Sequence, residues 1–168
     1  MQIRQESANE SDQEFADFYL ATERSLRAYA RRCVAGSGMA DDLVQEAYVR
    51  LLTSSKANLP PAERKLYLFR IATNLIRNHW SRGARWEHLE EAIEGEYGPR
   101  TSHDPNSLDV RRALHQMPPK YRSLLWLAYV EEYDHREIAD ILGLSRLSIK
   151  VLLSRARKKM ATFWRANK

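Results

Sequence analysis

Apolar residues recur at helical spacing along almost the whole chain, and this pattern constrains the fold more than any other feature. In the stretch DDLVQEAYVRLL, for example, Leu43, Ala47 and Leu51 fall on one helical face, with Tyr48 beside them. No stretch alternates convincingly between apolar and polar residues, as a half-buried strand would require. We therefore predict an all-α fold.

A change of composition divides the chain into two predicted domains. Residues 87–107 combine acids with Gly, Pro and Ser, which is typical of a flexible linker. A length of 168 residues accommodates two small helical domains. We predict a first domain over 1–86, an acidic flexible linker over 87–107 and a second domain over 108–168, whose first helix ends at Met117 because two prolines follow it.

The charged residues are unevenly distributed around a net charge of +5. Residues 63–86 hold six Lys/Arg against one Glu, and residues 110–168 hold thirteen against five acids. Residues 87–109 between them hold seven acids and one Arg. Two basic blocks that flank an acidic stretch predict two surfaces for a polyanion, although ordinary solvated faces would give the same counts.

Several functional classes find no support in the sequence. Cys33 is the single cysteine, so no intrachain disulfide is possible, and the five histidines are too scattered for a metal site. No apolar run is long enough for a membrane span, and the polar start MQIRQESANESDQEF has no signal-peptide core. The acids lie mostly at helix starts or in the linker and not in clusters. We expect a cytoplasmic protein with no cofactor, no metal and no catalytic site.

A helix-turn-helix pattern begins at His135, in the stretch HREIADILGLSRLSIKVLLS. Ala139 supplies the small side chain needed where two helices touch, and Gly143 falls where the turn needs a residue tolerant of positive φ. Asp134 and Glu137 match a capping box for the first helix, and Ser145 is a candidate N-cap for the second. The pattern predicts a short helix, a tight turn and a second helix.

The second helix of this motif is basic on its outward face. Its predicted buried face carries Ile149, Leu153, Ala156 and Met160. Its outward positions carry Arg146, Ser148, Lys150, Ser154 and Arg155, with Arg157, Lys158 and Lys159 further along. A capped basic helix is suited to enter a major groove and to contact phosphates. The alternative is a helical hairpin with a solvated basic face.

Three segments in order resemble the extracytoplasmic-function sigma factors, over residues 12 to 162. DDLVQEAYVRLL resembles the helix that binds the polymerase clamp, and LYLFRIATNLIRNHWSRGAR resembles the helix that melts and reads the minus-ten element. The stretch from Ala113 to Met160 resembles the domain that reads the minus-thirty-five element. The resemblance implies a protein that directs promoter-specific initiation by RNA polymerase.

The resemblance also implies site residues. Polymerase binding falls to Asp41, Asp42, Gln45 and Glu46. Minus-ten binding falls to Tyr67, Arg70, Asn74, Arg77, Asn78, Trp80, Arg82 and Arg85, with Asn74 at the position that reads a base turned out of the stack. Tyr67 and Trp80 would stack on bases, or they belong to the core. Minus-thirty-five binding falls to Arg146, Ser148, Lys150, Val151, Ser154 and Arg155.

The recognition helix departs from the family pattern. Where the family commonly has Gly-Thr-Val-Lys-Ser-Arg-Leu, this chain has Leu-Ser-Ile-Lys-Val-Leu-Leu from Leu147 to Leu153. Two usually polar positions are thus Val151 and Leu152. We expect Val151 to touch a thymine methyl group and Leu152 to widen the buried face.

The partners implied by the resemblance are core RNA polymerase, through its clamp coiled coil and its flap, promoter DNA and an anti-sigma factor. A free-standing helix-turn-helix regulator is the main alternative, but such proteins usually act as dimers and no dimerisation helix is evident. An adaptor that binds polymerase without reading DNA is disfavoured by the Lys/Arg density around Asn74 and on the last helix.

Overall fold

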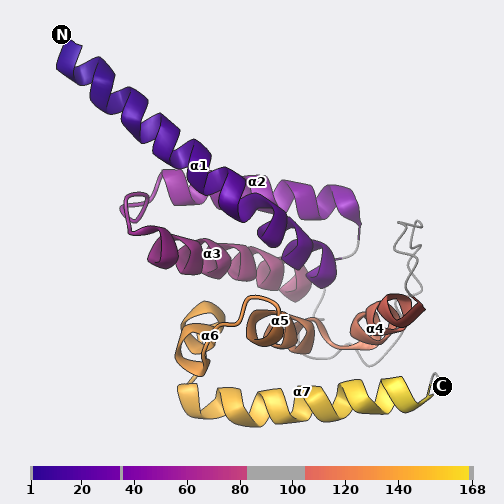
Figure 1. The fold of residues 1–168 in the computed structure, drawn as a ribbon. Helices are drawn as coiled ribbons and strands as arrows, with labels where there is room; N and C mark the ends of the chain where they lie inside the picture. The colour runs from indigo at the N-terminus through magenta and orange to yellow at the C-terminus, as the bar shows by residue number, and fades with distance from the viewer. Residues whose placement is uncertain (1, 35, 83–104, 167–168) are drawn as a thin grey trace.

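The computed structural model describes residues 2–34, 36–82 and 105–166, with side chains described at 11–34, 36–82, 110 and 112–166. The described residues form helices without any strand, which confirms the predicted all-α class (Figure 1). The helices are α1 (Gln2–Cys33), α2 (Ser37–Leu52), α3 (Pro61–Ser81), α4 (Pro105–Gln116), α5 (Pro119–Tyr129), α6 (His135–Leu142) and α7 (Arg146–Ala166). None of them is long and apolar enough to cross a membrane.

Prolines begin three of these helices. Pro61 and Pro119 lie in the first turns of α3 and α5, where the missing N–H costs nothing because no carbonyl precedes it within the helix. Helix α4 begins at Pro105, three residues before the start predicted for the second domain, and ends at Gln116. Most of the predicted linker lies outside the described residues.

Helices α1, α2 and α3 form the first layer of the molecule (Figure 1). Helix α2 buries Ala40, Val44, Ala47, Tyr48 and Leu51 against its neighbours. Leu43, which we predicted to be buried, is only half-buried, because it lies at the edge of the buried face, whose centre is nearer to Val44 and Leu51. Buried hydroxyl groups pair across this layer: Thr22 with Tyr48 at 2.7 Å, and Tyr29 with Thr73 at 2.8 Å.

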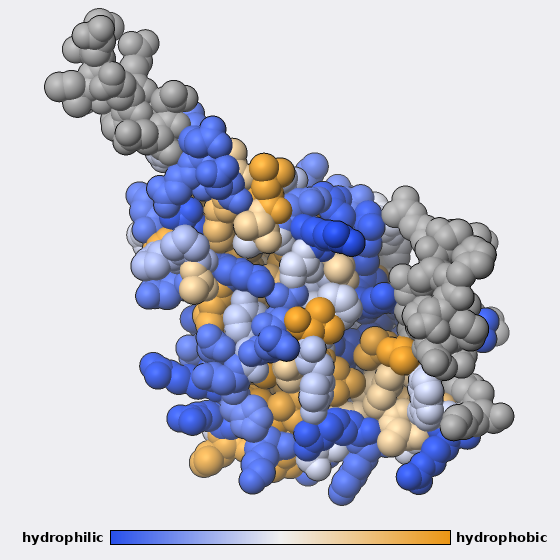
Figure 2. Space-filling view, viewed as in Figure 1, coloured by the Kyte–Doolittle hydropathy of each residue, from blue (hydrophilic) through white to orange (hydrophobic). Residues whose placement is uncertain are grey.

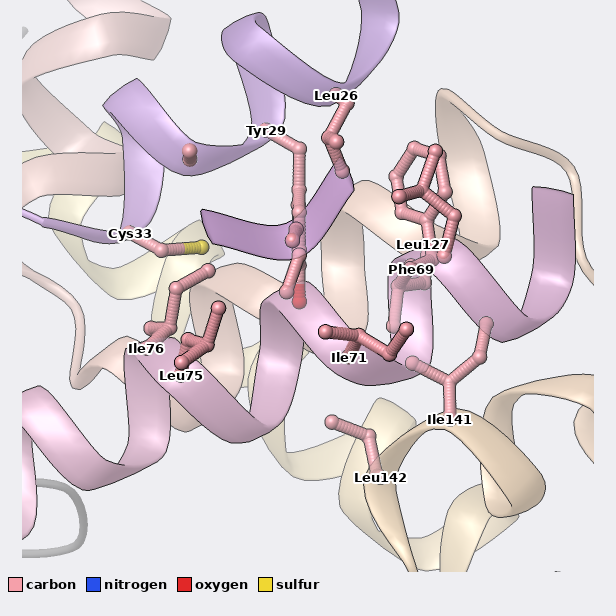
Figure 3. Packing of buried hydrophobic residues seen from close by; sticks show 14 of the residues in the cluster. Leu26, Tyr29, Cys33, Phe69, Ile71, Leu75, Ile76, Leu127, Ile141 and Leu142 are labelled. Atoms are coloured by element: carbon pink, nitrogen blue, oxygen red, sulfur yellow. The ribbon is translucent and has the colours of Figure 1, made fainter. Parts of the chain in front are cut away.

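The second layer shares its core with the first. Helix α6 packs on α3 and α5 packs on α1, while α7 runs along the far edge (Figure 1). Figure 3 shows Leu127, Ile141 and Leu142 of the second layer pointing toward Ile71 and other side chains of α1 and α3. Residues on both sides of the predicted linker therefore contribute to one continuous apolar cluster. We call the contact between the two layers the seam.

Polar groups cross the seam as well. The Glu131 side chain is only 4% exposed. It accepts a hydrogen bond from Ser25 and forms an ion pair with Lys65 at 3.0 Å. The buried Arg122 donates to the backbone oxygen of Arg32 at 2.9 Å. Burial raises the pKa of the Cys33 thiol to about 11, so this cysteine stays neutral beside Ser123. Cys33 is a free cysteine buried in the shared core.

A smaller cluster fixes the far end of α7. Met117, Leu125 and Ala156 are buried there, and Met160 and Phe163 of α7 are partly buried against them. Burial, and then the charges of Arg122 and Arg32, lower the pKa of His115 to about 4, so the imidazole is neutral near pH 7. This end of α7 packs on α4 and α5.

Because the two layers share one core, we predict that a cavity made in α6 lowers the stability of α3 as well. Leu142 is fully buried in the common cluster, so Leu142→Ala should lower the free energy of unfolding by about 2–5 kcal/mol. Hydrogen exchange should accelerate in α3 as well as in α6, whereas the control Met160→Ala should leave α3 protected. Unchanged exchange in α3 of Leu142→Ala would show that the two layers are stable independently.

Candidate polymerase- and DNA-binding surfaces

The outward face of α2 carries an acidic and polar line. Asp42, Gln45 and Glu46 are exposed on the side opposite the buried residues of this helix. Asp41 is different, because it is half-buried and pairs with Arg27 at 2.7 Å and Arg31 at 3.4 Å. Three of the four residues predicted to bind polymerase therefore face outward, and the fourth is engaged within the fold.

Apolar side chains continue the same face of α2, which the sequence analysis did not single out. Met39, Val49 and Leu52 are exposed by 40%, 55% and 48%. Together with Asp42 and Glu46 they follow one side of the helix at spacings of three or four residues. Glu46 is partly neutralised by Arg50 at 2.7 Å. The face offers negative charge at Asp42 and Glu46, and apolar contact at Met39 before them and at Val49 and Leu52 after them.

From Arg70 onward, helix α3 and its C-cap expose a line of polar side chains, and Glu63 and Ser81 are exposed on the same helix. Arg70, Asn74, Asn78 and Arg82 are all exposed and follow one another at four-residue spacing, so they lie on one side of the helix and its C-cap. Nine other positions of α3 are buried by neighbouring helices. An amide pair flanked by two guanidinium groups suits a nucleic-acid strand, since amides bond base edges and guanidinium groups bond phosphates. Arg85 lies outside the described residues.

Three further residues predicted for minus-ten binding are placed differently. Trp80 is 6% exposed and donates its indole N–H to the backbone oxygen of Cys33 at 2.7 Å, so its ring is part of the core and unavailable for stacking in this arrangement. Tyr67 is half-buried, with the Lys56 ammonium 4.7 Å from its ring centre. Arg77 donates to the backbone oxygen of Leu142 in α6 and thus joins the seam.

The helix-turn-helix has the predicted local chemistry. Asp134 accepts from the Glu137 amide at 2.8 Å, and Glu137 accepts from the Asp134 amide at 2.9 Å, which confirms the capping box. The hydrogen bond from the Glu137 backbone amide lowers the pKa of the Asp134 carboxyl group. Gly143 has φ 63°, the left-handed conformation that the turn needs, and Ala139 is buried at the helix contact.

Helix α7 presents its basic side chains to solvent. Ile149, Leu153 and Ala156 are buried as predicted, and Leu152 is half-buried against the core. Of the residues predicted to contact DNA, Arg146, Lys150, Val151 and Arg155 are exposed, while Ser148 and Ser154 are half-buried. Between its first and last residues α7 has seven Lys/Arg and no acid. Figure 2 shows hydrophilic side chains projecting along the edge that α7 forms in Figure 1.

Two regions of the sequence match known family models. Residues 18–86 match sigma-70 region 2, and residues 107–160 match sigma-70 region 4. The chain is also 30% identical over 151 residues to the ECF RNA polymerase sigma factor EcfG of Rhodopseudomonas palustris, covering 86% of this chain and 82% of that protein. The chain belongs to the ECF sigma factor family. It directs transcription initiation by core RNA polymerase and binds promoter DNA.

Other relatives agree with this assignment. The sigma factor is 28% identical over 156 residues to the ECF sigma factor SigE of Mycolicibacterium smegmatis, covering 86% of this chain and 60% of SigE. Its fold is similar to that of the sigma factor RpoE of Bartonella quintana, solved in complex with the anti-sigma factor NepR. That likeness has a TM-score of 0.71 at 21% identity, and covers 92% of this chain and 99% of RpoE.

The contrast between Arg77 and its exposed neighbours yields a prediction for this sigma factor. Arg77→Ala removes a charged donor from a backbone oxygen at the seam and should lower the free energy of unfolding by about 1–3 kcal/mol. Arg70→Ala and Arg82→Ala should change it by no more than about 0.5 kcal/mol, because both side chains are exposed. Urea unfolding measures the free energy of unfolding of the three variants. Equal values would contradict a stabilising role for Arg77 at the seam.

Proposed function

We propose that this sigma factor divides its work among three exposed surfaces. The outward face of α2 binds the clamp coiled coil of core polymerase, the polar line of α3 reads the minus-ten element, and α7 enters the major groove at the minus-thirty-five element while its domain meets the flap. The observation that carries the proposal is the line Arg70, Asn74, Asn78 and Arg82, because a mainly buried helix leaves these amide and guanidinium groups exposed on one side.

The groups on each surface suit the partner proposed for it. A basic coiled coil complements the carboxylates of Asp42 and Glu46, and it can cover Val49 and Leu52 in the same contact. Asn74 offers a donor and an acceptor to the edge of an unstacked base, whereas Arg70 and Arg82 hold the neighbouring backbone whatever its sequence. The acid-free face of α7 suits the phosphates that border a groove.

Promoter binding on both elements requires the seam to open. Elements centred about 25 base pairs apart are separated by roughly 85 Å of duplex, whereas a compact chain of this length has a radius of gyration of about 15 Å. The 22 residues from 83 to 104 can span at most about 75 Å when fully extended. Together with the size of the two layers themselves, this length allows each layer to dock on its own element. Opening also breaks the hydrogen bond between Arg77 and the backbone oxygen of Leu142, so Arg77 becomes available to contact DNA with the other arginines of α3.

The remaining assignments follow from this role. We place the protein in the cytoplasm with polymerase and DNA, and assign it no catalytic step or cofactor. An anti-sigma factor is the proposed regulator, supported by the likeness to RpoE, which was solved with NepR bound. The family assignment does not favour a free-standing helix-turn-helix regulator.

The first test reverses the charge of α2. Asp42→Arg with Glu46→Arg should weaken association with core polymerase by well over the roughly 1 kcal/mol of an ordinary surface pair, because attraction to a basic partner becomes repulsion. Asp12→Arg with Asp17→Arg on α1 is the matched control, since it changes the net charge equally at exposed positions. Equilibrium binding to labelled core enzyme measures both, and equal affinities for the two double variants would contradict the assignment of α2.

The second test separates base reading from backbone holding on α3. Asn74→Ala should relax the base preference at one minus-ten position, whereas Arg82→Ala should lower transcription about equally from every substituted promoter and reduce its salt dependence. In vitro transcription from a set of single-base promoter variants measures both effects. A uniform loss across all bases with Asn74→Ala would show that Asn74 does not read sequence.

A further inference from the structure

The centre of the outward face of α7 is apolar. Leu147 is 85% exposed, the highest exposure among the large apolar side chains of the described residues, and Val151 is 51% exposed. The two lie one turn apart on the helix that also exposes Arg146, Lys150 and Arg155. No described part of the molecule covers them, so they project from the recognition helix into solvent.

Helical geometry shows that this pair points away from the protein. At about 100° per residue, Leu147 and Val151 lie roughly 150–170° from the mean direction of the buried residues Ile149, Leu153 and Ala156. Lys150 and Arg155 lie at roughly 90–130°, one on each side of the pair. The helix therefore presents an apolar ridge with a cation along each flank.

A DNA major groove matches this pattern of charge. Two rows of phosphates border the groove and would meet Lys150 and Arg155, while the base edges at its floor would meet the ridge. The apolar group displayed on that floor is the thymine methyl group. Four residues of helix rise about 6 Å, against 3.4 Å per base pair, so two methyl groups one or two base pairs apart lie within reach of the ridge.

We propose that Leu147 and Val151 together select thymines in the upstream promoter element by contact with their methyl groups. This inference rests on the proposed entry of α7 into the major groove, and it adds Leu147 to the residues that determine specificity. The ridge replaces hydrogen-bonding readout at its centre, and the flanking cations supply affinity without choosing a base.

Replacing thymine by uracil tests the inference, because deoxyuridine lacks the methyl group and keeps its base pairing. Holoenzyme should be bound to a promoter fragment identified by mapping its transcripts, with each thymine of the upstream element replaced in turn. At one or two positions the replacement should weaken binding by about fourfold, the worth of one buried methyl group. Leu147→Ala and Val151→Ala should each abolish the thymine preference at one of those positions.

The controls distinguish this inference from the function on which it rests. Leu20→Ala removes an equally apolar side chain, 76% exposed on α1, and should keep the full response to uracil. Promoter binding that depends on Lys150 and Arg155 but is indifferent to every uracil, or an upstream element without thymine, would overturn the inference and leave the proposed function standing. Failure of the holoenzyme to bind any promoter fragment would overturn both. The ridge could instead bind a second copy of the chain or another protein. In that case Leu147→Ala would weaken the binding of that partner and leave the response to uracil unchanged. This result would also overturn the inference.

Discussion

Burial of α3 on more than one side is the constraint on which the rest of the structure depends. Leu68, Phe69 and Ala72 belong to the cluster shared with α1 and α2, and α6 packs on the same helix from the other layer. A 21-residue helix buried in this way keeps only a narrow side for solvent. That side includes the line from Arg70 to Arg82, so the packing of the core decides which groups are available for the proposed contact with the minus-ten element.

The seam combines a continuous apolar cluster with charges that are costly to bury. Lys65, Ser25 and Trp126 all contact the Glu131 carboxylate, so these side chains take the place of the water that would otherwise solvate it. Such pairs contribute little net stability because desolvation offsets their attraction, but they define how the layers fit together. Opening the seam returns these groups to water, which offsets part of the cost of exposing Ile71, Ile141 and Leu142. A contact of this kind is suited to the proposed opening, in which the two layers dock apart.

Local features of this structure could be predicted from sequence, because their causes are local. The capping box of Asp134 and Glu137, the turn at Gly143 and the helix start at Pro61 each depend on a few neighbouring residues. Periodicity also indicated the outward position of Lys150, and the family resemblance implied Asp42 and Asn74. It indicates that a face is buried, however, and not which element covers it. The burial of Trp80 against Cys33, the engagement of Arg77 by α6 and the pairing of Asp41 with Arg27 all depend on contacts between distant segments.

The account holds that one chain gives polymerase its promoter choice through two DNA-reading helices that work apart. Transcription of genomic DNA by core polymerase, with and without this protein, followed by mapping of the 5′ ends, tests that claim most directly. The account predicts start sites that appear only when both are present and that share two upstream elements about 25 base pairs apart. Start sites that do not depend on the protein, or that share a single element or a palindrome, would contradict it.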